Sequence, residues 1–138
     1  MVEEVLAIHA LPLATEDDVV AIRRLVREIA HQRKFDAFAI AAITTATSEL
    51  ARNVIVHGKG GNAKVEEISD GLRNGIRIAF VDTGPGIEDI PRVMSGGYST
   101  ARSMGLGLSG SKRLVDVFDL ESKVGKGTRV TVTKWKRF

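Results

Sequence analysis

The chain has 138 residues, of which 43% are hydrophobic and 27% are charged, and it contains no cysteine. This length suits one domain with its own core, and the composition is that of a globular chain. The net charge of +3 gives no reason to expect nucleic-acid binding, and the lack of cysteine excludes disulfides and thiolate metal sites. Because no apolar run could span a membrane, we expect a single cytoplasmic domain over residues 1–138 with no membrane partner.

The first half of the sequence predicts one strand and two helices. Residues 3–11 alternate loosely between apolar and polar side chains, as a half-buried strand does. Thr15 and Asp18 have the spacing of a helix cap, and residues 19–29 continue with apolar side chains at helical spacing. A second, alanine-rich helix is expected over residues 36–57, where glycine follows it.

The second half predicts most of a sheet. Residues 63–69 and 76–81 are expected to form strands joined by a turn with Asp-Gly and Asn-Gly pairs. A short helix near residues 89–94 and a longer one over residues 108–118 follow, and residues 120–135 close the chain as a hairpin. These elements predict an α+β fold, a two-layer sandwich whose mixed, mostly antiparallel sheet carries helices on one face.

Two polar residues of the second helix form the first candidate site. Glu49 and Asn53 are four residues apart, so their side chains project from one face of the helix. An amide oxygen is a good ligand for Mg²⁺ and a carboxylate can accept a proton, so the pair could hold a metal ion and position an attacking oxygen. A solvated helix face explains such a pair equally well, and the spacing alone does not decide between the two.

A second candidate follows the strand predicted over residues 76–81. Asp82 ends this apolar segment, and Gly84 and Gly86 come directly after it. A carboxylate in this place can accept a hydrogen bond from the exocyclic amine of adenine, and glycines leave room for a flat base close to the backbone. An ordinary turn after a strand uses the same residue types.

A further glycine-rich segment precedes the helix predicted over residues 108–118. Gly105 and Gly107 would let the backbone wrap a triphosphate at the helix N-terminus, where free amides attract phosphate. Lys112 would add positive charge within the first turns of that helix. A lone pair of glycines before a helix is a weak signal by itself.

The order of these motifs is more specific than any one of them. The chain reads E-x-x-x-N on a helix, D-x-G-x-G after a strand, G-x-G before a helix and G-x-G-T before the last strand. This order resembles the Bergerat-type ATP-binding fold shared by DNA gyrase, Hsp90, histidine kinases and MutL. Within that superfamily, residues 44–53, 82–87, 97–100 and 112–114 resemble the RsbT-type switch serine/threonine kinases of bacterial stressosomes, of the anti-sigma regulatory kinase family. The likeness covers nearly the whole chain.

The resemblance implies a role for each motif residue. Asn53 would coordinate Mg²⁺ between the phosphates of ATP, and Glu49 would be the carboxylate nearest the attacking oxygen. Asp82 would contact the adenine amine, with Thr128 supporting it through water. Residues 88–104 would form a lid, whose backbone would wrap the phosphates. The residues that leave room for the base or contact the phosphates would be Gly84, Gly86, Arg102, Gly105, Gly107 and Lys112.

The resemblance also implies a function. We expect an ATP- and Mg²⁺-dependent protein kinase that phosphorylates STAS-domain antagonist proteins, components of the stressosome scaffold among them. Such a kinase would then switch partner and activate a PP2C-type phosphatase. The alternative is an anti-sigma factor that sequesters a sigma factor in a nucleotide-dependent way, because both classes share these motifs. A non-catalytic member of the fold is disfavoured because Glu49, Asn53 and Asp82 are all present.

Overall fold

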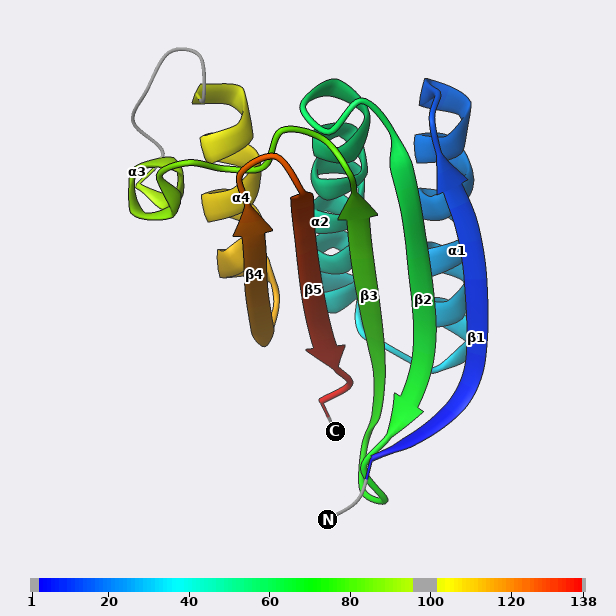
Figure 1. Ribbon diagram of the computed structural model, residues 1–138. Helices are drawn as coiled ribbons and strands as arrows, with labels where there is room; N and C mark the ends of the chain where they lie inside the picture. Colours follow the sequence, from blue (N-terminus) through cyan, green and yellow to red (C-terminus); the bar gives the residue numbers. More distant parts are fainter. Residues whose placement is uncertain (1–2, 96–101, 138) are drawn as a thin grey trace.

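The computed structural model describes residues 3–95 and 102–137, with side chains in the second range from Gly107 onward. Within these residues the chain forms one sheet with helices on one of its faces (Figure 1). The elements follow one another as β1 (Glu4–Leu13), α1 (Glu16–Gln32), α2 (Ala37–Val56), β2 (Gly61–Ser69), β3 (Asn74–Asp82), α3 (Ile90–Met94), α4 (Arg102–Leu114), β4 (Val117–Lys123) and β5 (Gly127–Trp135). No helix in the described ranges combines the length and the low polarity that crossing a membrane requires.

The sheet has the strand order β1-β2-β3-β5-β4, and its neighbouring strands pair antiparallel throughout. The predicted α+β sandwich is confirmed, but the described part of the sheet contains no parallel pair and so is not mixed. The connections between the strands explain why these pairs are antiparallel. Two packed helices, α1 and α2, separate β1 from β2, so the chain re-enters the sheet at the end where it left, and Leu13 pairs with Gly61. Short turns join β2 to β3 and β4 to β5, as in antiparallel hairpins.

Capping side chains fix the starts of the first two helices. Asp18 accepts a hydrogen bond from the backbone N–H of Thr15 (3.0 Å), and Asp36 accepts one from Ala39 (2.8 Å). Each carboxylate satisfies a donor and lies at the positive end of its helix dipole. The helix predicted over residues 36–57 is confirmed, with its two end residues acting as caps.

The helix α4 begins earlier than the sequence predicted. It starts before Gly105 and Gly107, so both lie inside it, whereas the prediction was a turn followed by a helix over residues 108–118. Glycine costs about 1 kcal/mol in a helix interior. However, α4 packs against α2, and a Cβ added at Gly107 would lie 3.0 Å from Asn53 Nδ2. Packing between the two helices therefore outweighs the local preference of glycine for a turn.

At its other end, α4 ends earlier than predicted, and β4 begins earlier. The N–H of Asp116 donates to the carbonyl of Thr133 (2.9 Å), and its carboxylate accepts from the N–H of Trp135 (2.7 Å). These bonds attach Asp116 to β5, so the next residue, Val117, already pairs as a strand. Phe118 therefore belongs to β4 and not to the predicted helix.

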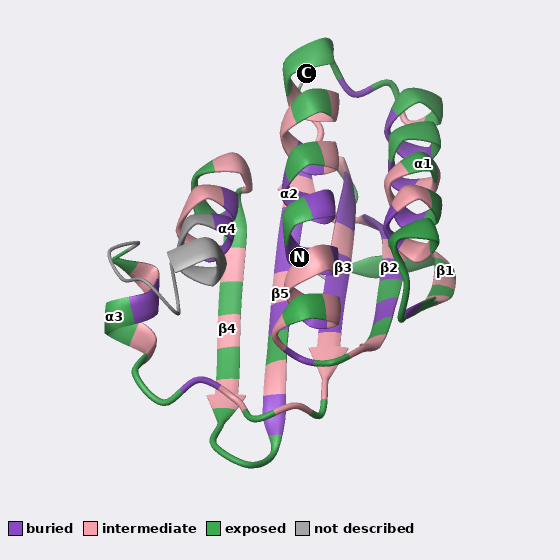
Figure 2. Cartoon of the chain, turned by 90° about the horizontal axis from the view of Figure 1, so that it is seen from above, coloured by how far each residue is buried: buried purple, intermediate pink, exposed green. Residues whose placement is uncertain are grey.

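The core lies between the sheet and the helical layer, and Figure 2 shows buried residues on the sides of α1 and α2 that face the strands. Ile76, Ile78 and Phe80 alternate along β3 and are at most 1% exposed, which confirms that they share a face. Burying one such side chain contributes about 1.5–3 kcal/mol. The helices meet them with Val19, Ile22, Val26, Ile43 and Leu50.

One carboxylate is buried at the edge of this core. Glu67 of β2 accepts hydrogen bonds from His9 of β1 (2.8 Å) and from Arg33 at the end of α1 (3.0 Å). Burial raises the pKa of Glu67, but the hydrogen bonds from His9 and Arg33 outweigh it, and the pKa is held below its usual value. The ionised carboxylate therefore connects two strands to the first helix.

We predict that Glu67→Gln lowers the free energy of unfolding by about 1–3 kcal/mol at pH 7, because Arg33 loses its charged partner. A depressed carboxyl pKa stabilises the fold above the usual value near 4.5, and this contribution is lost as the pH falls through the folded-state pKa. Urea unfolding should therefore show the gap between variant and wild type closing below that pH. Glu121→Gln, at an exposed position of β4, is the control; a gap independent of pH would contradict the prediction.

Candidate functional site

A cavity with about 400 Å³ of empty space lies where α2, α4 and the ends of β3 and β5 meet. Its polar groups come from Asn53, His57, Asp82 and Thr128. Apolar walls with a few convergent polar groups are typical of small-molecule sites. The apolar lining consists of Leu50, Val54, Phe80, Ile87, Leu108 and Val130.

Asp82 is the best-fixed polar group of this cavity. Its Oδ1 accepts hydrogen bonds from the N–H of Gly84 (2.9 Å) and from the N–H of Thr128 (3.3 Å). Asp82 and Thr128 are register partners of β3 and β5, so the sheet itself holds the carboxylate. The backbone of Thr128 thus supports Asp82 directly, in addition to the water-mediated role that the resemblance implies for this residue. The Thr128 hydroxyl hydrogen-bonds Ser122 (2.9 Å).

Gly58, which the sequence indicated only as the end of a helix, is part of the same site. A Cβ added at Gly58 would lie 2.5 Å from Asp82 Cβ, and one added at Gly84 would lie 2.8 Å from Gly58 Cα. The chain after α2 therefore touches the chain after β3 with no side chain between them. Sequence reasoning could not find this contact, because a glycine after a helix is explained by the cap alone.

Gly86 has two constraints of its own. Its φ of +78° lies in the left-handed region, which glycine adopts without strain. A Cβ added there would lie 2.8 Å from the backbone carbon of Lys123. Gly86 thereby docks the turn after β3 against the β4–β5 hairpin, while also lining the cavity.

Asn53 lines the cavity from α2, as the sequence predicted. Its Nδ2 is shielded from solvent and has no hydrogen-bond partner among the residues that the structure describes. An amide donor left in this state costs about 1–3 kcal/mol, and unsatisfied groups of this kind are characteristic of functional positions. Gly107 of α4 faces this amide, so α4 closes the cavity on the side of Asn53.

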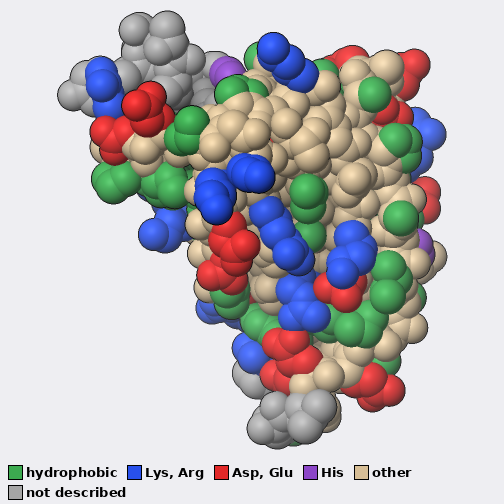
Figure 3. Space-filling view, in the orientation of Figure 1, with side chains coloured by type: hydrophobic (Ala, Val, Ile, Leu, Met, Phe, Trp, Pro, Cys, Tyr) green, Lys and Arg blue, Asp and Glu red, His purple; other side chains and the backbone are tan. Residues whose placement is uncertain are grey.

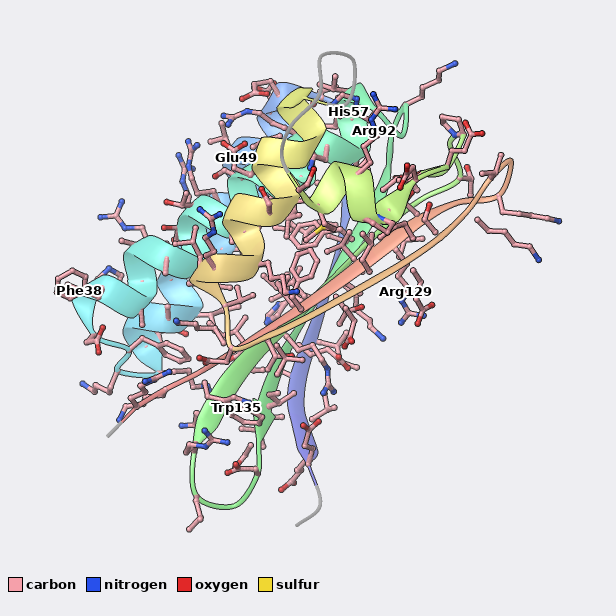
Figure 4. All side chains as sticks on the ribbon, turned by 90° about the vertical axis from the view of Figure 1, so that its left-hand side faces the viewer. Phe38, Glu49, His57, Arg92, Arg129 and Trp135 are labelled. Atoms are coloured by element: carbon pink, nitrogen blue, oxygen red, sulfur yellow. The ribbon has the colours of Figure 1, made fainter. Side chains whose placement is uncertain are left out.

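Glu49 lies one helical turn before Asn53 but outside the described lining of the cavity. Its side chain is 48% exposed and stands 3.8 Å from Nη1 of Arg52, which also contacts Glu16 of α1 (3.1 Å). Figure 4 shows Glu49 midway along α2, with His57 at one end and Phe38 at the other. A solvent-facing carboxylate beside the cavity is accessible to a second protein.

Besides Gly107, α4 contains three residues that were predicted to contact phosphate: Arg102, Gly105 and Lys112. Lys112 is in the last turn of α4, not in its first turns as predicted, about 10 Å along the axis from Gly105. It is also absent from the described cavity lining. The backbone of Gly105 lies within α4. The side chain of Arg102 and lid residues 97–100 lie outside the described residues.

His57 was not predicted as a site residue. It follows α2 and lines the cavity. Burial lowers the pKa of His57, so the imidazole is neutral at neutral pH and presents both a donor and an acceptor.

The sequence also did not predict the apolar lining of the cavity. Alternating residues such as Phe80 and Val130 indicate a core strand, and nothing in that pattern shows which end of the strand faces a cavity.

Comparison with known proteins identifies the class of site. Residues 39–137 match the family model described as histidine kinase-, DNA gyrase B-, and HSP90-like ATPase. The chain is 44% identical over 125 residues to the serine/threonine-protein kinase RsbT of Bacillus subtilis, covering 91% of this chain and 94% of that one. It is 38% identical over 103 residues to an anti-sigma F factor of Clostridium botulinum, covering 69% of this chain and 70% of that one.

Two solved structures share the fold. The RsbU and RsbW domains of a Mycobacterium tuberculosis protein match with a TM-score of 0.66 and 23% identity, over 96% of this chain and 33% of that one. The SiaB-SiaC complex from Pseudomonas aeruginosa matches with a TM-score of 0.57 and 10% identity, over 95% of this chain and 90% of that one. At these identities the likeness shows the fold alone.

We predict that Gly58→Ala weakens ATP binding about five- to a hundredfold, because the new methyl group displaces the Asp82 carboxylate from its partners. Binding of a fluorescent ATP analogue measures the effect. Gly75→Ala is the matched control: its Cβ would lie 2.6 Å from the Trp135 ring at the opposite end of β3. Both variants should lose stability, but only Gly58→Ala should lose affinity, and equal affinities would show that Gly58 does not position Asp82.

Proposed function

The chain belongs to the histidine kinase-, DNA gyrase B- and HSP90-like ATPase family, and on this premise we propose that it is an ATP- and Mg²⁺-dependent serine/threonine protein kinase. The observation that carries the proposal is the 44% identity, over nearly the full length of both chains, to a serine/threonine-protein kinase. Three residues in or beside the cavity support the proposal.

Asp82 is the residue that would recognise adenine. One carboxylate oxygen is held by two backbone N–H groups, and an ionised carboxylate has further lone pairs with which to accept a hydrogen bond from the exocyclic amine. Gly58 and Gly86, which line the cavity, would let the base approach the backbone beside this carboxylate, whereas Gly84 packs against Gly58. The apolar walls, including Phe80 and Ile87, would cover the faces of the base.

Asn53 is the residue that would hold magnesium. Mg²⁺ is commonly bound by one or two protein oxygens together with phosphates and water, and an amide oxygen is a suitable ligand. The described residues contain no cluster of three or more histidine or acidic side chains that could hold a metal unaided, which fits an ion shared with the nucleotide. The unsatisfied Nδ2 of Asn53 would gain an acceptor from a phosphate oxygen.

Glu49 is the residue that would act on the substrate hydroxyl. The hydroxyl oxygen forms a bond to the γ-phosphorus as the bond to the β–γ bridging oxygen breaks, ADP leaves, and the hydroxyl proton passes to the carboxylate. Positioning and charge neutralisation supply most of the rate in such transfers. A positioned base adds on the order of 10²–10⁴-fold. The exposure of Glu49 beside the cavity suits a protein substrate.

The proposed substrates are STAS-domain antagonist proteins, including components of a stressosome scaffold, with a PP2C-type phosphatase as a later partner in the cytoplasm. The relationship to a serine/threonine-protein kinase named RsbT and to anti-sigma F factors supports a partner-switching role. The anti-sigma relatives also support the second candidate, a nucleotide-dependent anti-sigma factor. A pull-down that offers both a STAS-domain protein and a sigma factor distinguishes them.

We predict that Asp82→Asn weakens ATP binding by about 1–3 kcal/mol, or about five- to more than a hundredfold, because an acceptor is lost and the adenine amine is left poorly paired. The fold should persist, since the backbone bonds of β3 and β5 remain. Titration calorimetry measures the affinity, and urea unfolding confirms that the variant is folded. Wild-type affinity would remove Asp82 from the site.

We predict that Glu49→Gln retains ATP and loses phosphoryl transfer by about 10²–10⁴-fold, and that Asn53→Ala loses transfer by loss of the magnesium ligand. Transfer of radiolabelled γ-phosphate from ATP–Mg²⁺ to a purified STAS-domain protein tests both. Glu121→Gln, on the exposed side of β4, should label the substrate at the wild-type rate. Undiminished transfer by Glu49→Gln would assign that carboxylate a structural role. A wild-type protein that binds ATP but labels nothing would favour the anti-sigma candidate.

A further inference from the structure

A second hollow, separate from the cavity, lies between α1 and α2 and contains about 1030 Å³ of empty space. Arg23, Arg24 and Arg27 line it from α1, and Ile40 and Ala41 line it from α2. With Val20 and His31 on α1, and Ala37 and Thr44 on α2, the lining recurs every three or four positions on each helix, so it forms two facing stripes. We call this hollow the basic groove.

The arginines of the basic groove are unlike most others in the chain. Arg33, Arg52 and Arg77 each form an ion pair with a carboxylate, and so do Arg73 and Arg137. Across residues 3–95 and 107–137, Arg23, Arg24 and Arg27 form no such pair. No acidic residue from the described part of the chain lines the groove either. Three positive charges are therefore concentrated in one place without internal neutralisation.

The open face of the sheet provides the contrast. Figure 3 shows Lys and Arg side chains there beside Asp and Glu side chains. Arg77, for example, contacts both Glu3 and Glu66 on this face. Mixed charges are what a solvated surface ordinarily carries. A concave surface of one sign instead attracts a ligand of the opposite sign and accelerates its encounter.

The basic groove is also positioned relative to the candidate base. Thr44 lines the groove on α2, and Glu49 is five residues further along the same helix, about 7.5 Å along the axis. Both Glu49 and Thr45 are exposed, so the surface of α2 is open between the groove and Glu49.

We propose that the basic groove docks an acidic segment of the protein substrate and thereby presents the neighbouring hydroxyl to Glu49. The proposal rests on the kinase function proposed above, and it names the surface and the charge by which the substrate is chosen. The apolar side chains of Ile40 and Ala41, which line the groove from α2, would contact an apolar side chain of the segment while its carboxylates meet the arginines. Long-range attraction of this kind is weakened by salt.

The test compares Arg24→Glu/Arg27→Glu with Lys64→Glu/Arg129→Glu, which reverses the same number of charges on the open face of the sheet. Initial rates of phosphorylation are measured against the concentration of a purified STAS-domain protein. The groove variant should raise KM about tenfold or more and should flatten its dependence on salt, with kcat and ATP affinity retained. The sheet variant should stay close to wild type.

Equal KM values for the two variants would overturn the proposal, as would a groove variant that lost kcat alone. Arg24→Gln/Arg27→Gln, which removes the charges without reversing them, should give an intermediate KM if charge is the cause. A labelled polyglutamate peptide at low ionic strength provides a test that does not depend on kinase activity. Its fluorescence anisotropy should rise with wild type and the sheet variant but not with the groove variant. If the wild-type protein transfers no phosphate, the proposed kinase function fails, but the peptide experiment still tests the groove. A peptide that binds both variants alike would refute the docking role of the groove.

Discussion

The contact of three backbone segments around Asp82 is the constraint on which the rest of the site depends. Gly58 follows α2, Gly84 follows β3 and Gly127 begins β5, and a Cβ added at any of them would overlap its neighbours. Gly127 also has a φ of +126°, which glycine adopts most readily. The end of α2 is thus fastened to the centre of the sheet without intervening side chains, and a carboxylate is held at the junction by backbone N–H groups.

Because α2 is fixed at this junction, the distance along the helix sets the positions of Asn53, Glu49 and the groove residues of α2. Asn53 is one turn from the junction and faces the cavity, whereas Glu49 is two turns away and faces solvent. Further along, Ile40 and Ala41 line the basic groove. One helix therefore carries the proposed nucleotide contact, the candidate base and one side of the proposed docking surface at intervals fixed by the rise of 1.5 Å per residue. Preorganisation of this kind places reacting groups without a large conformational change.

Much of the fold could be predicted from local signals, and the failures have physical causes. Alternation along β3 and the cap at Thr15 and Asp18 predicted a strand and a helix correctly, because each signal acts within a few residues. The start of α4 could not be predicted, because packing against α2 outweighs the preference of its glycines for a turn. Of the site, Asp82 and Asn53 were found through the order of motifs, whereas Gly58 was missed because its partner is distant in sequence. The placement of Lys112 failed together with the start of its helix.

The two surfaces of α2 bear on how one fold serves both kinases and anti-sigma factors. Asn53 and the cavity face α4, so in the proposed function the phosphates would bind beside the contact between Asn53 and Gly107. The basic groove instead lies between α2 and α1, which pack against each other. A change in the groove can therefore alter which protein is bound while the nucleotide contacts stay the same. Conversely, loss of the carboxylate at Glu49 would leave a protein that still binds nucleotide and partner. Because both classes share the motifs of the cavity, we expect the surface that meets the partner protein to separate a kinase substrate from a sigma factor.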